Sequence, residues 1–150
     1  MNTNATILIA DDDEDDLFLV HAALQDCENT NPTACVSDGL EVLDYLRRAS
    51  DDQPVGLVLL DLNMPRMNGR EVLKIIKSDK ELRKTPVVVL TTSKSQHDID
   101  ACYDLGANSY IVKPASFEVF NETIATLVKY WIDLAQLPAL CLATAVFLGV

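Results

Sequence analysis

The sequence predicts an α/β fold of the doubly wound type, in which helices cover both faces of a five-stranded parallel sheet. Short apolar runs alternate five times with segments that carry helix-start signals. Four of these runs are almost continuously apolar, which is typical of parallel strands buried on both faces. The 150 residues fit one domain, and the apolar share of 49% is enough for one core.

The expected elements follow one another along the chain. The strands are expected at residues 6–10, 33–36, 55–60, 87–90 and 110–112. Between them, a capping side chain is followed three residues later by an acid, which marks a helix start. These pairs are Asp13/Asp16, Asp38/Glu41, Asn68/Glu71 and Ser95/Asp98. A spacing of three and four residues predicts one apolar stripe along the last helix, formed by Phe117, Phe120, Ile124, Leu127, Trp131 and Leu134.

The composition narrows the function classes. A net charge of −11 argues against nucleic acid as a direct partner and favours a cation or a basic protein surface. The four cysteines form no C-x-x-C pair, so reduced, buried thiols are expected. The N-terminus lacks a signal-peptide pattern, and the apolar stretch near the C-terminus falls short of the roughly 20 residues of a spanning helix. We therefore expect a cytoplasmic protein without a membrane span.

Polar side chains stand where four of the predicted strands end. Asp11 and Asp12 follow the first strand, Asp61 follows the third, Thr91 the fourth and Lys113 the fifth. Because ligands of doubly wound sheets bind beyond the carboxyl ends of the strands, these groups are expected to converge there. The acids at positions 13–16 are assigned instead to the start of the first helix, where the helix dipole favours carboxylates.

This set of groups suits a phosphoryl group and a metal ion. Three adjacent carboxylates cannot all remain ionised at low cost, and a hard divalent cation such as Mg²⁺ or Mn²⁺ relieves their repulsion. The ammonium group of Lys113 can neutralise phosphoryl oxygens, and a carboxylate can act as the nucleophile. The sequence thus predicts a metal-dependent site for phosphoryl chemistry.

The acid pair Asp11-Asp12, the stretch "DLNMP" at 61–65, Thr91 and the pair Lys113-Pro114 stand in the same order as in a known family. Over residues 6 to about 134 the sequence resembles the CheY-like receiver domain of response regulators. The resemblance implies a flavodoxin-like sheet of strand order 2-1-3-4-5 and a receiver domain over 1–137. For the apolar tail over 138–150, packing on the domain, dimerisation and a foreign origin all stay open.

The resemblance also implies roles at the metal and phosphoryl site. Asp61 would be phosphorylated by a histidine kinase and would contact the metal. Asp12 would bind Mg²⁺ directly, Asp11 would hold a metal-bound water, and Asn63 would contribute its backbone carbonyl.

The same resemblance implies the parts that respond to phosphorylation. Thr91 and Lys113 would bind phosphoryl oxygens. Tyr110 would be an aromatic switch that moves together with Thr91. The peptide bond between Lys113 and Pro114 would be cis.

The function implied is a phospho-acceptor switch of two-component phosphorelay signalling, rather than a metabolic enzyme. A stand-alone receiver would act on a downstream protein target. The face made by the helix after Ser95, the strand at 110–112 and the last helix is the expected contact surface. A homodimer through that face or through the C-terminal tail stays open. The stretches "CENTNP", "TTSKS" and "KYWIDLAQLP" resemble single-domain receivers that pair with phytochrome-type histidine kinases.

Three alternatives compete with this interpretation. A phosphatase of the aspartyl-phosphate class needs a second acid two residues after the nucleophile, where this chain has Asn63. A nucleotide- or flavin-binding domain needs a phosphate-cradling loop, but the five glycines are scattered. A binding module that is never phosphorylated stays open.

Overall fold

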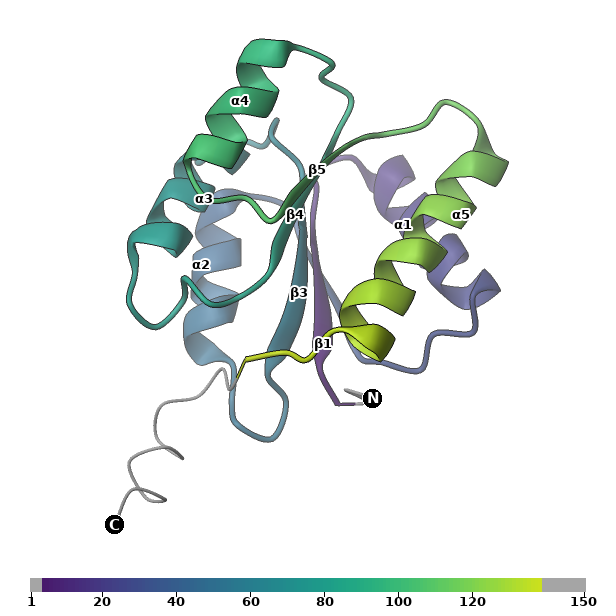
Figure 1. Ribbon diagram of the computed structural model, residues 1–150, viewed down its shortest axis with the longest axis horizontal. Coiled ribbons are helices and arrows are strands. Elements are labelled where there is room, and N and C mark those ends of the chain that lie inside the picture. The colour runs from purple at the N-terminus through teal and green to yellow at the C-terminus, as the bar shows by residue number, and fades with distance from the viewer. Residues whose placement is uncertain (1–3, 139–150) are drawn as a thin grey trace.

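The computed structural model describes residues 4–138, and it shows a parallel sheet between two layers of helices (Figure 1). The strand order is β2-β1-β3-β4-β5. The strands are β1 (Thr6–Ala10), β2 (Thr33–Val36), β3 (Val55–Leu60), β4 (Val87–Thr91) and β5 (Ser109–Val112). The predicted fold class and strand order are confirmed, and β4 and β5 are each one residue longer than expected.

The helices begin at the predicted capping residues. They are α1 (Glu14–Asp26), α2 (Gly39–Arg48), α3 (Gly69–Ser78), α4 (Gln96–Asp104) and α5 (Phe117–Val128). Each of the four predicted capping side chains accepts a hydrogen bond from the backbone N–H of the residue three positions later. This N–H has no hydrogen-bond partner within the helix itself. Helices α1 and α5 cover one face of the sheet, and α2, α3 and α4 lie on the other (Figure 1).

Two apolar clusters fill the space between the sheet and its helices. Successive strand residues point to opposite faces, so Leu8 joins the cluster under α2 and α3 while Ile7 joins the one under α1 and α5. In β1, β3 and β4 every residue is buried, whereas the edge strand β2 alternates between exposed and half-buried residues. This burial on both faces explains the continuous apolar runs. Burying one aliphatic side chain completely stabilises the folded state by about 1.5–3 kcal/mol relative to leaving it exposed.

The chain leaves the predicted helical spacing after α5 and continues as a π-helix, η1 (Lys129–Leu134). A π-helix closes its hydrogen bonds over five residues instead of four, so the buried face shifts along the sequence. Ile132 is therefore buried, with 1% of its surface exposed, whereas Leu134 is 65% exposed. The predicted apolar stripe is confirmed at its centre and wrong at its ends, because Phe117 is also half exposed.

The Lys113-Pro114 peptide bond is trans, since no peptide bond in the described part of the chain is cis. The expectation of a cis bond is wrong here. The trans form of a bond before proline is favoured by only about 0.5–1 kcal/mol. The presence of a proline therefore does not determine whether the bond is cis or trans.

Other expectations concern the chain ends and the cysteines. Cys27, Cys35 and Cys102 are free thiols, as expected, and Cys141 lies outside the described residues. The expected burial holds for Cys102 but is wrong for Cys35, which is exposed because it lies on the edge strand β2, and Cys27 is half-buried. The tail that follows Pro138 also lies outside them. Within residues 4–138, no helix has the length and apolar character needed to cross a membrane.

Candidate functional site

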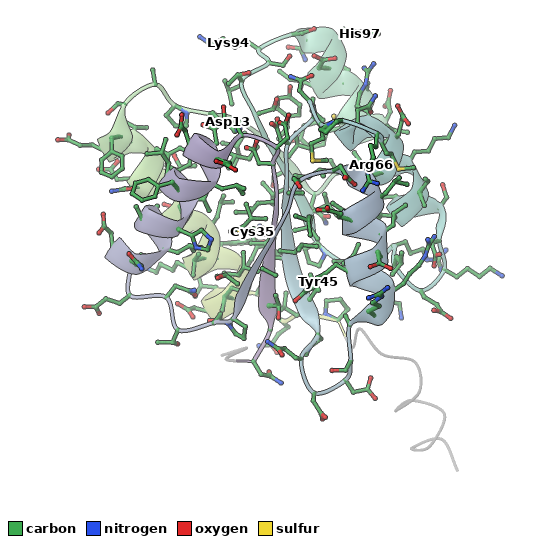
Figure 2. The ribbon with its side chains drawn as sticks, turned by 180° about the vertical axis from the view of Figure 1, so that it is seen from behind. Asp13, Cys35, Tyr45, Arg66, Lys94 and His97 are labelled. Carbon is green, nitrogen blue, oxygen red and sulfur yellow. The ribbon has the colours of Figure 1, made fainter. Side chains whose placement is uncertain are left out.

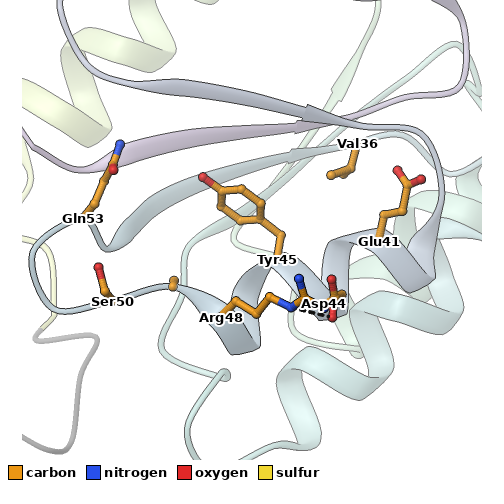
Figure 3. Close-up of a pocket in the computed structure, with 8 residues that line it drawn as sticks. Val36, Glu41, Asp44, Tyr45, Arg48, Ser50 and Gln53 are labelled. Carbon is orange, nitrogen blue, oxygen red and sulfur yellow. Dashed lines mark ion pairs between the residues drawn. The ribbon is translucent and has the colours of Figure 1, made fainter.

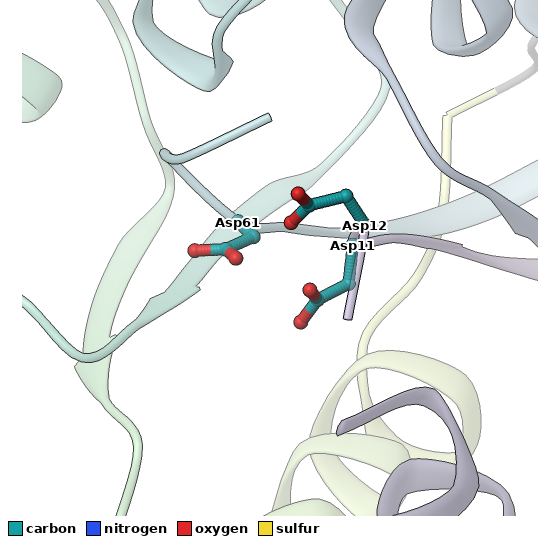
Figure 4. Close-up of side chains that lie close together, drawn as sticks. All are labelled: Asp11, Asp12 and Asp61. Atoms are coloured by element: carbon teal, nitrogen blue, oxygen red, sulfur yellow. The ribbon is translucent and has the colours of Figure 1, made fainter. Parts of the chain in front are cut away.

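The polar residues singled out in the sequence meet at the carboxyl ends of the central strands. Asp61 follows β3, and its N–H donates to the carbonyl of Ala10, the last residue of β1, over 2.9 Å. Carboxylate oxygens of Asp11, Asp12 and Asp61 all lie within 4.8 Å of one another. Figure 4 shows the three side chains together at the ends of neighbouring strands. The predicted convergence of these carboxylates is thus present in the structure.

Lys113 supplies the positive charge at this cluster. Its Nζ donates to Asp11 Oδ2 over 2.6 Å and to Asp16 Oδ2 over 2.8 Å, and it lies 3.5 Å from Asp61 Oδ2. Only 8% of the Lys113 side chain is exposed. The N–H of Lys113 also donates to the carbonyl of Thr91 over 2.7 Å, which ties the end of β5 to the end of β4.

The electrostatics of the cluster favour a further cation. Burial raises the pKa of Asp11 to about 6, although hydrogen bonds from Lys113 and from the Asp13 N–H act in the opposite direction. Burial alone lowers the pKa of Lys113, but its hydrogen bonds to Asp11 and Asp16 and the attraction of Asp61 raise it overall. A single ammonium group thus faces several carboxylates. Hard oxygen ligands in a negative surrounding are what a divalent cation such as Mg²⁺ prefers.

Thr91 and Tyr110 lie on the two strands next to this cluster. Thr91 is fully buried, and its Oγ1 has no hydrogen-bond partner within residues 4–138. A buried hydroxyl without a partner costs about 1–3 kcal/mol, so this donor fits an acceptor that joins the site, such as a phosphoryl oxygen. Tyr110 is half-buried, and its hydroxyl donates to the carbonyl of Ser93 over 3.0 Å. Tyr110 thus contacts the loop that follows Thr91.

The loop between β3 and α3 carries Asn63, which is exposed two residues after Asp61. The loop closes on itself, because the N–H of Gly69 donates to the carbonyl of Leu62 over 2.9 Å. The N–H of Leu62 donates in turn to Asp61 Oδ1 over 2.8 Å, which orients the carboxylate. The loop backbone therefore helps to set the direction of the Asp61 side chain.

Two residues at the site were not assigned to it from the sequence. Asp16 was placed only at the start of α1, yet its carboxylate reaches Lys113 across the site. Gly69 was not singled out, yet a Cβ atom there would lie 2.2 Å from the carbonyl oxygen of Asp61. The dipeptide Asn68-Gly69 at the predicted helix start was the available signal for a close backbone approach.

We expect Gly69→Ala to destabilise the protein by about 2–3 kcal/mol, because the added methyl group overlaps backbone atoms that cannot turn away. In an ordinary helix the same change stabilises by up to about 1 kcal/mol, so the expected sign is reversed. Urea unfolding at 25 °C measures the difference. Ser78→Ala, at the exposed end of the same helix, is the control and should change stability by less than about 0.5 kcal/mol. A Gly69→Ala variant as stable as the wild type would contradict the close contact.

A cavity lies away from the carboxylates. A pocket of about 460 Å³ runs between β2 and α2, and Val36, Tyr45 and Gln53 are among its lining residues (Figure 3). Its charged groups include the pair Asp44–Arg48, whose 3.1 Å contact is exposed to solvent. A smaller pocket of about 150 Å³ lies beside Asn63. The polar chemistry of the site thus sits at the strand ends and not in the larger cavity.

Comparison with known proteins agrees with this geometry. Residues 7–125 match the family model of the response regulator receiver domain. FilR2 of Methanothrix harundinacea is 37% identical over 134 residues, which cover 88% of this chain and 86% of that protein. The response regulator Rcp1 of a Synechocystis species is 33% identical over 141 residues, which cover 92% of this chain and 96% of Rcp1.

Solved structures give the same result. The phosphorylated cyanobacterial phytochrome response regulator RcpA superposes with a TM-score of 0.82 at 37% identity, covering 90% of this chain and 99% of RcpA. The Mn²⁺-bound form of Rcp1 superposes with a TM-score of 0.80 at 32% identity, covering 89% of this chain and 99% of Rcp1. The chain therefore belongs to the response regulator receiver domain family, whose members are switches of two-component signalling.

Proposed function

We propose that Asp61 accepts a phosphoryl group in a Mg²⁺-dependent reaction, and that this modification switches the protein between two signalling states. The observation that carries the proposal is the position of Asp61. Its carboxylate lies within 4.8 Å of those of Asp11 and Asp12, and 3.5 Å from the ammonium group of Lys113. Family membership supports the general role of a signalling switch.

The residues at the strand ends suit a divalent cation. Asp11, Asp12, Asp61 and the backbone carbonyl of Asn63 would hold it, with Asp12 as a direct ligand and Asp11 acting through a water molecule. The solved Mn²⁺-bound form of Rcp1 supports a divalent cation in this family. When bound, the cation neutralises negative charge on the phosphoryl oxygens.

Each of three residues would have its own role in the transfer of the phosphoryl group. A carboxylate oxygen of Asp61 attacks phosphorus and forms a P–O bond, while the P–N bond to the imidazole of a phosphohistidine donor breaks. Lys113 exchanges part of its contact with Asp11 for a phosphoryl oxygen. The unpartnered hydroxyl of Thr91 donates to another phosphoryl oxygen. Movement of Thr91 would shift the loop at Ser93, whose carbonyl accepts a hydrogen bond from Tyr110. The charge of the phosphoryl group would thus change the surface around Tyr110.

Two kinds of protein partner would interact with the receiver: the phosphoryl donor and the target that receives the signal. The donor would be a sensor histidine kinase, and the relation to RcpA, a phytochrome response regulator, supports one of the phytochrome type. The output would be a contact with a downstream protein or a second copy through α4, β5 and α5. Tyr103 on α4 and Phe117 on α5 are each 50% exposed, which supplies apolar area for such a contact. The receiver unit would span residues 1–137, since Ile132 and Leu137 still pack on the core.

Phosphorylation by acetyl phosphate tests the proposal. The wild-type protein is incubated with and without Mg²⁺, and intact mass spectrometry measures the product. We expect a gain of one phosphoryl group only with Mg²⁺, and peptide mapping should place it on Asp61. No gain with Mg²⁺, while circular dichroism shows an intact fold, would contradict the proposal and favour a binding module that is never phosphorylated.

A further inference from the structure

We infer that the ion pair between Arg66 and Asp38 clamps the β3–α3 loop and thereby sets the affinity of the site for a divalent cation. The inference rests on the proposed function, because it takes Asp61 and the carbonyl of Asn63 as the loop's cation ligands. Neither Arg66 nor Asp38 belongs to the carboxylate cluster, so both are positioning residues. Figure 2 labels Arg66 close to the start of α2.

Asp38 is buried, and both of its carboxylate oxygens accept hydrogen bonds. It is 5% exposed and caps α2, where its Oδ1 accepts from the Glu41 N–H over 2.9 Å. Its Oδ2 accepts from Arg66 Nε over 2.8 Å and lies 2.6 Å from Arg66 Nη2. Burial raises the pKa of Asp38, but the hydrogen bonds from Glu41 and Arg66 outweigh it and lower the pKa overall. Asp38 is therefore ionised and fixed to the first turn of α2.

Arg66 holds the loop in a conformation that needs support. Its φ angle is 63°, in the left-handed region that residues with a side chain rarely adopt. This conformation is unfavourable for residues with a Cβ atom and persists only when other contacts fix it. The contacts of the guanidinium group with Asp38 are of this kind. Since Arg66 lies three residues after Asn63, releasing it frees the backbone that would carry the ligand carbonyl.

A second tie joins the same two segments. The N–H of Gly39, at the start of α2, donates to the carbonyl of Met67 over 3.0 Å. A Cβ atom at Gly39 would lie 2.5 Å from that carbonyl oxygen, so the backbones are in close contact. The loop between Asp61 and Gly69 is therefore closed at its base and held to α2 at its tip. A loop fixed in this way loses little conformational freedom when a cation binds.

Charge alone and the clamp predict opposite results for one variant. Arg66→Gln removes a positive charge from an acidic region, so simple electrostatics predicts tighter Mg²⁺ binding. Asp38→Asn removes a negative charge, so electrostatics predicts weaker binding. The clamp predicts that both variants bind Mg²⁺ more weakly, by about 10-fold, as when the supports of metal ligands are removed. The sign for Arg66→Gln therefore separates the two explanations.

Calorimetric titration of the full chain with Mg²⁺ at 25 °C measures these affinities. The exposed pair Asp44–Arg48 on α2 provides matched controls. Electrostatics alone acts on these variants, so Arg48→Gln should bind Mg²⁺ slightly more tightly than the wild type and Asp44→Asn slightly more weakly. The double variant of Arg66→Gln and Asp38→Asn should lose no more Mg²⁺ affinity than either single variant, because both substitutions remove the same contact. Urea unfolding, run in parallel, shows that each variant is folded at the titration temperature.

The outcomes are distinguishable. A wild-type protein that binds no Mg²⁺ overturns the proposed function and the inference with it. If the wild type binds Mg²⁺ while Arg66→Gln binds it equally or more tightly, the clamp alone is overturned. Lower stability of both variants without a change in Mg²⁺ affinity also overturns it, since that result leaves Arg66 and Asp38 a purely structural role.

Discussion

Asp61→Asn is expected to abolish the Mg²⁺-dependent phosphorylation by acetyl phosphate. The amide that replaces the carboxylate is a much weaker nucleophile, and the change removes one of the charged oxygens that would hold the cation. Intact mass spectrometry should show no phosphoryl gain under conditions that modify the wild type completely. Asp104→Asn, at an exposed acid of α4, is the control and should be modified like the wild type.

The same variant should fold at least as stably as the wild type without metal. Asp61 is 8% exposed and close to two other carboxylates, so removing its charge lowers their mutual repulsion. The 3.5 Å contact with Lys113 is lost, but Lys113 keeps its shorter contacts with Asp11 and Asp16. Urea unfolding in the presence of a chelator checks this point. A variant that is still phosphorylated at its full rate would show that another residue accepts the group, and the role proposed for Asp61 would be wrong.

Lys113→Met is expected to have the second large effect, on stability and on phosphorylation together. Lys113 is the buried cation that touches Asp11, Asp16 and Asp61, and removing one partner of a buried ion pair costs about 3–5 kcal/mol. The loss of a positive group that would contact the transferred phosphoryl group should slow phosphorylation by about 100-fold or more.

Mg²⁺ should partly restore the stability of Lys113→Met. A divalent cation can neutralise the carboxylates that the ammonium group leaves behind, and a ligand that binds only the folded state stabilises it. We therefore expect Mg²⁺ to raise the melting temperature of the variant more than that of the wild type. Lys94→Met, which removes an exposed lysine, should behave like the wild type in both assays. An equal response to Mg²⁺ in wild type and Lys113→Met would contradict a shared role of Lys113 and the cation.

Features that depend on neighbouring residues could be predicted from the amino-acid sequence. Buried strands read as continuous apolar runs, and capping residues such as Asp38 and Asn68 marked helix starts, because both signals act within a few residues. The acids that follow the first and third strands were enough to predict the carboxylate cluster, since parallel strands bring their carboxyl ends to one edge. The site was thus predictable because its main residues stand at the ends of strands or within three residues of them.

Contacts between segments that are distant in the sequence could not be predicted and became visible in the folded structure. The bond between Arg66 and Asp38 joins two loops, and Asp16 reaches Lys113 across the sheet edge. The π-helix that buries Ile132 and the trans bond before Pro114 depend on free energy differences that local sequence does not resolve. In each case packing between elements selects one of several conformations of similar local free energy, and no pattern within a single element records that choice.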